Sequence, residues 1–173
     1  MELSWGILGC ANIAQKNVRA ILLSVGNKLK AIATRSEDKG KAFMRENDIS
    51  PDMVTLYTKY EDLLGDASID AIYVPLPTTM HLEWVQRIAA AGKHVLCEKP
   101  IAVNADELRT MLDVCNQNGV VFMDGVMFMH HQRIHALRKT LSDPLFGVIL
   151  DCVSKVSTEI SCNRDRQTNN CIQ

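Results

Sequence analysis

The chain has 173 residues, of which 47% are hydrophobic and 23% are charged, so it is long enough to build a domain with a full core. The net charge of −1 argues against a nucleic-acid partner, and no apolar stretch is long enough to cross a membrane. The 6 cysteines include no CxxC pair, so we expect reduced thiols in a cytoplasmic protein and no zinc site.

The first two thirds of the chain alternate predicted strands with predicted helices. An apolar strand at 3–8 leads through a glycine turn into a helix, in which Ala14, Val18, Ile21 and Val25 recur at helical spacing. Further strands are predicted at 29–33, 54–57, 71–74, 94–97 and 120–123, and further helices at 36–47, 60–64, 79–91 and from Asn104 to just before Gly119. This alternation predicts an α/β fold with a doubly wound parallel sheet.

Capping residues predict where two of the later helices begin, and apolar spacing predicts which faces are buried. Ser36 and Asn104 are good N-cap residues, and Glu107 stands at the capping-box position after Asn104. The residues expected on the buried faces are Leu82, Val85, Ala89, Leu108, Met111, Leu112 and Cys115.

The character of the chain changes after Met123. A helix is predicted at 130–141, with Ile134, Leu137 and Leu141 on one face, followed by one long strand at 146–156. The last stretch is polar and has no periodicity, so we expect it to be poorly ordered. The predicted organisation is a nucleotide-binding domain at 1–126, the first elements of a second α/β domain at 127–156, and a polar tail at 157–173.

The glycine turn after the first strand resembles a degenerate dinucleotide-binding fingerprint. In the pattern GxGxxG, Gly9 allows the tight turn, Ala11 stands where the backbone approaches a pyrophosphate, and Ala14 is small enough for close packing of helix on sheet. The free N–H groups between Cys10 and Ile13 and the start of the helix suit a phosphate. We therefore predict that this turn holds a dinucleotide.

The end of the second strand predicts which dinucleotide is bound. An NAD site usually carries an acidic residue here, but this chain has Thr34, Arg35 and Ser36. An arginine and two hydroxyls suit a 2′-phosphate, which favours NADP over NAD. The same residues argue against an S-adenosylmethionine-binding methyltransferase, whereas a surface arginine beside a helix cap remains the alternative.

Two more loops follow strands and therefore belong to the same edge of the sheet. Glu98 and Lys99 stand between the strand at 94–97 and Pro100, where a carboxylate can accept from ribose hydroxyls and an ammonium can stabilise a substrate oxygen. The alternative is a solvated ion pair before a turn. The second loop, at 75–77, is followed by His81, which is either a site residue or a packing residue.

The three histidines that follow the first predicted domain do not favour a metal site. His131 and His135 are four residues apart and could share a helix face with His130 nearby. No carboxylate or cysteine completes a ligand set, so we predict no metal.

Taken together, these motifs resemble the glucose-fructose oxidoreductase and inositol dehydrogenase (Gfo/Idh/MocA) family. The matching stretches, in order and spacing, are Gly6 to Ala14, Tyr60 to Leu64, Ile69 to Val74, Pro77 to His81, Ala91 to Val95, and Glu98 to Pro100. Met123, Asp124 and Gly125, followed by His130 and Arg133, are similar to the dihydrodiol and xylose dehydrogenase branch.

The resemblance implies a Rossmann domain, a second α/β domain, and hydride transfer between NAD(P) and a sugar, polyol or related alcohol. It implies that Glu98 holds the nicotinamide ribose, that Lys99 binds this ribose and the reacting oxygen as the catalytic residue, and that Pro77 and His81 line the nicotinamide side. The cofactor-binding residues expected on all grounds are Gly9, Cys10, Ala11, Asn12, Ile13, Thr34, Arg35, Ser36, Leu76, Pro77, His81, Glu98 and Lys99.

The chain is short for the family that it resembles. Members of the family are about twice as long, and their second domain supplies a further catalytic group and a dimer interface, which implies a homo-oligomeric full-length form. Two hypotheses follow from the sequence. One is an NADP-dependent oxidoreductase represented by its cofactor domain, and the other is a truncated, non-catalytic NADP-binding module or partner subunit.

Overall fold

The computed structural model describes residues 2–143, and the contacts divide the chain into two units, Met1–His130 and His131–Gln173. The first unit contains a parallel sheet with the strand order β3-β2-β1-β4-β5-β6. The strands are β1 (Leu3–Leu8), β2 (Asn27–Ala33), β3 (Thr55–Tyr57), β4 (Ala71–Val74), β5 (His94–Cys97) and β6 (Phe122–Asp124). The predicted doubly wound parallel sheet is confirmed.

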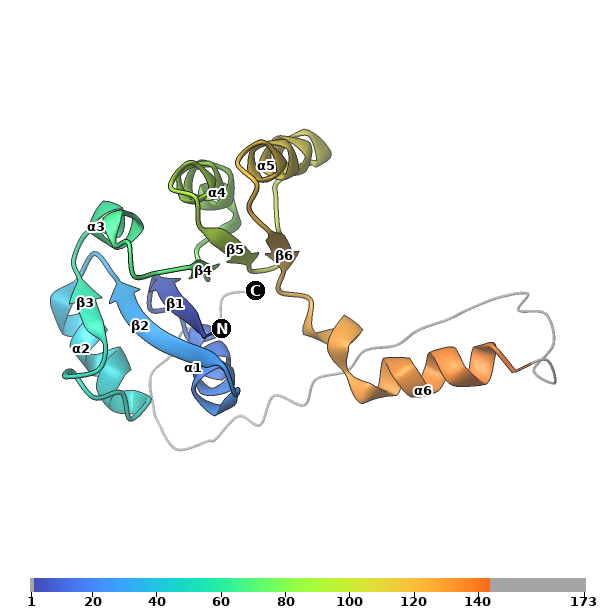
Figure 1. Cartoon of the computed structure of the whole chain (residues 1–173), viewed down its shortest axis with the longest axis horizontal. Coiled ribbons are helices and arrows are strands. Elements are labelled where there is room, and N and C mark those ends of the chain that lie inside the picture. Colours follow the sequence, from blue (N-terminus) through green and yellow to red (C-terminus); the bar gives the residue numbers. More distant parts are fainter. Residues whose placement is uncertain (1, 144–173) are drawn as a thin grey trace, which may run out of the picture. The chain divides into compact units, whose positions relative to one another are not determined.

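Helices cover both faces of this sheet (Figure 1). Two helices, α1 (Ala14–Leu23) and α2 (Glu37–Glu46), pack on one face. On the other face lie α3 (Tyr60–Gly65), α4 (His81–Ala90), which follows a short 3₁₀ turn η1 (Thr78–Met80), and α5 (Ala105–Gln117). Because both faces are covered, β4 in the middle of the sheet is buried at every residue, as is typical of parallel sheets.

The core consists of two layers, one on each side of the sheet. In β1, Ile7 belongs to the layer under α1 and α2, whereas its neighbour Leu8 belongs to the layer under α3, α4 and α5, and both are fully buried. In β4, Tyr73 belongs to the layer under α1 and α2, and Ile72 belongs to the layer under α3, α4 and α5. Successive side chains of a strand point to opposite faces, so each central strand supports both layers.

The two predicted N-caps are confirmed. The Ser36 hydroxyl accepts a hydrogen bond from the backbone N–H of Lys39 at 3.3 Å. The side-chain oxygen of Asn104 accepts from the N–H of Glu107 at 2.9 Å, and the Glu107 carboxylate accepts from the N–H of Val103 at 3.2 Å. These caps fix where α2 and α5 begin.

Several predicted core positions are wrong or only partly right, and Leu108 is one that is only partly buried. Val25 lies beyond the end of α1 and is fully exposed, because the chain turns there through Gly26, whose φ is 80°. Leu112 is 45% exposed, since Met111 and Cys115 form the buried stripe of α5 and Leu112 lies beside that stripe. Leu82 is partly buried and packs at the margin of the core under α4.

The described part of the chain ends with a 3₁₀ turn, η2 (Met127–His130), and the helix α6 (Gln132–Leu141) of the second unit. Ile134 is buried, whereas Leu137 is 50% exposed. The strand predicted at 146–156 and the tail predicted at 157–173 lie outside the described residues, so the domain boundaries stay a prediction. None of the helices described here is long and apolar enough to span a membrane.

Candidate functional site

The loops that follow β1, β2 and β4 surround a cavity of about 350 Å³ at the carboxyl edge of the sheet. In open α/β sheets this edge is where ligands bind. The cavity is lined by Gly9, Cys10, Ala11, Thr34, Arg35, Ser36, Lys39, Tyr60, Pro75, Leu76, Pro77 and Met80. Eight of the predicted cofactor residues, distant in sequence, therefore come together in one cavity: Gly9, Cys10, Ala11, Thr34, Arg35, Ser36, Leu76 and Pro77.

The glycine turn has the geometry that its pattern predicts. Gly9 has a φ of 109°, and a Cβ at this position would stand 3.0 Å from a methyl carbon of Leu76. Both facts disfavour any side chain at Gly9. Because glycine has none, space remains between the turn and the loop after β4. Asn12 and Ile13 follow in the turn, and no side-chain hydrogen bond caps the start of α1, which suits an anion. Neither residue is among those that line the cavity.

The β2 end of the cavity carries two cationic side chains, Arg35 and Lys39. Lys39 was missed by the sequence analysis, although it stands three residues after the Ser36 cap, where a first-turn side chain points back toward the loop. Tyr60 also lines this end. Burial raises the pKa of the Tyr60 hydroxyl, and the neighbouring Arg35 opposes that shift. Burial also raises the pKa of the Cys10 thiol in the turn, which disfavours its thiolate.

At the end of β5, the Glu98 carboxylate is held inside the protein rather than in solvent. Glu98 is 5% exposed, and its Oε1 accepts hydrogen bonds from the Tyr73 hydroxyl at 2.6 Å and from Asn17 Nδ2 at 3.4 Å. Its Oε2 accepts from the backbone N–H of Lys99 at 3.2 Å. The side chain of Lys99 is exposed at the same edge. The alternative of a solvated Glu98–Lys99 ion pair is therefore wrong for Glu98.

Tyr73 and Asn17 were missed by the sequence analysis. Tyr73 is fully buried, and burial followed by its hydrogen bond to Glu98 raises the pKa of its hydroxyl. The sequence did contain one indication of this role, because Tyr73 is the polar residue of the otherwise aliphatic strand β4. A buried hydroxyl needs a hydrogen-bond partner, so a polar group had to lie near it. Asn17 offered no signal, since it stands on the half-exposed side of α1.

His81 is the first residue of α4 and is 1% exposed. Its two ring nitrogens lie 2.7 Å from the carbonyl oxygen of Leu76 and 2.8 Å from that of Ile101. His81 is not among the residues that line the cavity. It connects the loop after β4 to the segment after Pro100, and its place on the nicotinamide side stays a prediction.

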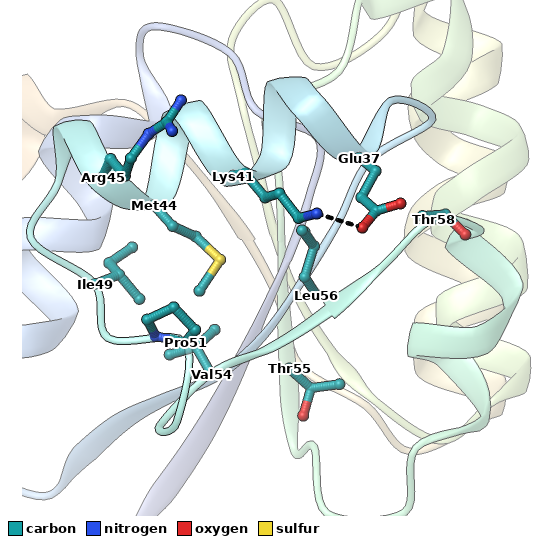
Figure 2. Close-up of a pocket in the computed structure, with 10 residues that line it drawn as sticks. All are labelled: Glu37, Lys41, Met44, Arg45, Ile49, Pro51, Val54, Thr55, Leu56 and Thr58. Carbon is teal, nitrogen blue, oxygen red and sulfur yellow. Dashed lines mark ion pairs between the residues drawn. The ribbon is translucent and has the colours of Figure 1, made fainter.

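Two of the other hollows differ from this cavity in the residues that line them. One, of about 200 Å³, lies at the ends of β5 and β6 and is lined in part by Asn17 and Gly125. The other, of about 780 Å³, lies between α2 and β3 (Figure 2). It is mainly apolar, and Lys41 and Glu37 at its margin form an ion pair with each other at 2.7 Å. Although it is the larger hollow, it contains none of the predicted site residues.

One of the histidines near residue 130 has a structural role. His131 caps α6, because its Nδ1 accepts from the backbone N–H of Arg133 at 3.1 Å. Within residues 2–143, no group of three His, Cys, Asp or Glu side chains is arranged to hold a metal ion.

Comparison with known proteins agrees with this geometry. A family model described as an oxidoreductase family with an NAD-binding Rossmann fold matches residues 3–126. The chain is 35% identical over 161 residues to D-xylose 1-dehydrogenase (NADP(+)) 2 of Haloferax volcanii, a match that covers 93% of this chain and 48% of that protein. It is 32% identical over 149 residues to trans-1,2-dihydrobenzene-1,2-diol dehydrogenase of Sus scrofa, covering 85% of this chain and 43% of that protein.

Among solved structures, the chain is similar to a 3-ketoreductase from Actinomadura kijaniata in complex with NADP and TDP-benzene. The TM-score is 0.74 at 32% identity, and the match covers 82% of this chain and 42% of that one. The chain thus spans about half the length of the curated relatives it matches.

Proposed function

This chain belongs to the Gfo/Idh/MocA family of oxidoreductases, and we propose that it binds NADP at the carboxyl edge of its sheet. We further propose that it forms the cofactor half of an enzyme that transfers hydride to or from a sugar, polyol or related alcohol. Relatives named for such substrates, including xylose and dihydrodiols, support this substrate class. In this proposal the complete enzyme is a homo-oligomer, as the family resemblance implies.

The observation that carries the NADP assignment is the pair of cations at the β2 end of the cavity. Arg35 and Lys39 line the same space as the hydroxyls of Thr34 and Ser36. This set suits a doubly charged phosphate monoester, because a guanidinium can bind it bidentately and hydroxyls can complete its shell. Asp and Glu are not among the residues that line the cavity, so a 2′-hydroxyl has no carboxylate acceptor there.

The residues also fit the remainder of a dinucleotide. Gly9 leaves the close approach that a pyrophosphate requires, and the start of α1 has no side-chain cap that would compete with it. Glu98 and Lys99, at the end of β5, stand on the nicotinamide side in this assignment. NADP(H) supplies or accepts the hydride when it is bound. The exposed Lys99 ammonium then orients the substrate oxygen and stabilises negative charge that develops on it.

Cofactor preference tests this proposal directly. We expect the unmutated chain to bind NADP about ten- to hundred-fold more tightly than NAD, because a hydrogen bond to a charged group contributes about 1.5–3 kcal/mol. Arg35→Asp should reverse this preference, since Asp accepts from a 2′-hydroxyl and repels a phosphate. Isothermal titration calorimetry with both dinucleotides measures the two affinities.

A matched control separates this contact from a general effect of charge. Arg109→Asp changes the net charge equally on α5, where Arg109 is exposed and pairs with Asp106. This control should leave the ratio of the two affinities unchanged. Equal affinities of the unmutated chain for NADP and NAD would contradict the proposal.

A further inference from the structure

We infer that Tyr73 and Asn17 are positioning residues for the nicotinamide half of the cofactor site, where they hold Glu98 and, through it, the backbone of Lys99. This inference rests on the proposed NADP-binding function. Tyr73 comes from β4, Asn17 from α1 and Glu98 from the end of β5, and their polar groups meet at one carboxylate.

The contacts on Glu98 account for its place in the interior. A buried carboxylate is costly unless hydrogen bonds replace its water. Tyr73 supplies a short bond of 2.6 Å to Oε1, in the range of a charge-assisted O–H···O⁻ bond, and Asn17 adds a longer one of 3.4 Å to the same atom. Oε2 remains to accept the N–H of Lys99 at 3.2 Å. Hydrogen bonds therefore hold both carboxylate oxygens, and Oε2 in turn holds the backbone N–H of Lys99.

The surroundings of the carboxylate restrict it to this position. A Cβ on Gly125 would stand 3.2 Å from Oε1 of Glu98 and 3.2 Å from the carbonyl oxygen of Cys97. Gly125 also donates its N–H to that Cys97 carbonyl at 2.7 Å. The backbone of Gly125 thus closes one side, and a side chain there would crowd the carboxylate beside it.

The hydroxyl of Tyr73 contributes to this network and not to packing. The ring is fully buried in the core layer under α1, where a phenylalanine ring would fill the same space. Burial and the bond to Glu98 raise the pKa of the hydroxyl, so it stays protonated and can donate. Removing only the oxygen therefore tests the contact while keeping the core volume.

The experiment compares two ligands that share one half. NADP spans the whole site, whereas adenosine 2′,5′-bisphosphate carries the 2′-phosphate half and lacks the nicotinamide and its ribose. Calorimetry on the 173-residue chain should show that Tyr73→Phe weakens NADP binding about tenfold while the bisphosphate affinity changes less than about twofold. Asn17→Ala should weaken NADP binding about threefold, with the same selectivity, because its bond to Glu98 is longer.

Tyr57→Phe is the matched control. It removes another tyrosine–carboxylate hydrogen bond, at 3.1 Å to Asp66, from a tyrosine that does not line the cavity. We expect it to leave both affinities unchanged. Thermal unfolding of each variant by circular dichroism shows whether it is folded, and if Tyr73→Phe is not, Asn17→Ala on the half-exposed side of α1 decides the question.

Each outcome has a defined meaning. Equal weakening of both ligands by Tyr73→Phe, or by Asn17→Ala where that variant decides, indicates a general loss of structure and overturns the inference. No weakening of either ligand overturns it as well. If the unmutated chain binds neither ligand, the proposed function fails and this inference with it. If it binds both and the variants match it, the inference alone fails.

Discussion

At the scale of single residues, the side chains of the neighbours Cys97 and Glu98 lie on opposite sides of the sheet. Cys97 is fully buried in the core layer under α4 and α5, whereas the Glu98 carboxylate turns toward Asn17 of α1. Burial, reinforced by the charge of Glu98, raises the pKa of the Cys97 thiol to about 12. A shift of this size links the stability of the sheet to alkaline pH.

The thiol of Cys97 should make the protein less stable as the pH rises above about 9. In the unfolded chain the thiol ionises near its ordinary pKa of 9.0, but in the folded protein it keeps its proton to about 12. The unfolded state therefore binds fewer protons in this window, so the free energy of unfolding falls with pH. Urea denaturation at several values between about pH 8 and 11 should show a shallower fall for Cys97→Ala than for the unmutated chain. Parallel curves for the two proteins would exclude this origin.

At the scale of elements, the seating of α2 on the sheet depends on Gly40. A Cβ at this position would stand 2.6 Å from a methyl carbon of Leu56 in β3 and 2.9 Å from the methyl carbon of Thr34, which follows β2. Leu56 can turn its methyl groups into the groove between α2 and β3, which it lines (Figure 2). Thr34 is β-branched and donates its N–H to the carbonyl oxygen of Tyr57 at 2.9 Å, so it has less freedom to move.

Gly40→Ala should therefore destabilise the protein by up to about 2 kcal/mol, although alanine is the better helix former. The gain in helix propensity is about 1 kcal/mol, whereas overpacking a tight contact costs about 1–3 kcal/mol and the strain falls on Thr34. We also expect weaker NADP binding, since Thr34 lines the cavity. Urea denaturation and calorimetry measure the two effects.

Gly65→Ala provides the comparison for this prediction. Gly65 ends α3, and no heavy atom lies within 4 Å of the place where its Cβ would stand. The substitution should leave the stability unchanged or raise it slightly. A Gly40→Ala variant as stable as Gly65→Ala would show that α2 adjusts without cost.

At the scale of the whole molecule, we expect that the chain can bind NADP without catalysing the oxidation of a substrate. All the residues proposed to contact NADP lie between Gly9 and Lys99, in the unit that ends at His130. The family resemblance assigns a second proton-handling group to the following domain, and turnover needs such a group together with a wall that excludes water. We therefore expect the 173-residue polypeptide, tested by itself, to bind NADP and to oxidise no sugar or polyol. Steady NADPH production from any such alcohol would contradict this prediction.

The sequence by itself determined the local structure of this protein. β4 at 71–74 and β5 at 94–97 have the predicted bounds, and the caps at Ser36 and Asn104 form as expected. These features depend on residues within one or two turns of each other, or on the apolar content of a short run, so the local pattern contains the information. The glycine turn belongs to the same group, because Gly9 meets a backbone requirement of its own position.

Only the tertiary structure decided how the polar groups of the site are paired. Glu98 was a predicted site residue, but its partners Tyr73 and Asn17 stand 25 and 81 residues before it. Lys39 and Tyr60 likewise line the cavity without being predicted, and the two backbone carbonyls that His81 contacts, those of Leu76 and Ile101, were not predicted either. Hydrogen-bond partners follow from the order of strands in the sheet and from the face on which each helix packs. No periodicity along the chain contains that information, because packing brings together residues that are far apart in the sequence.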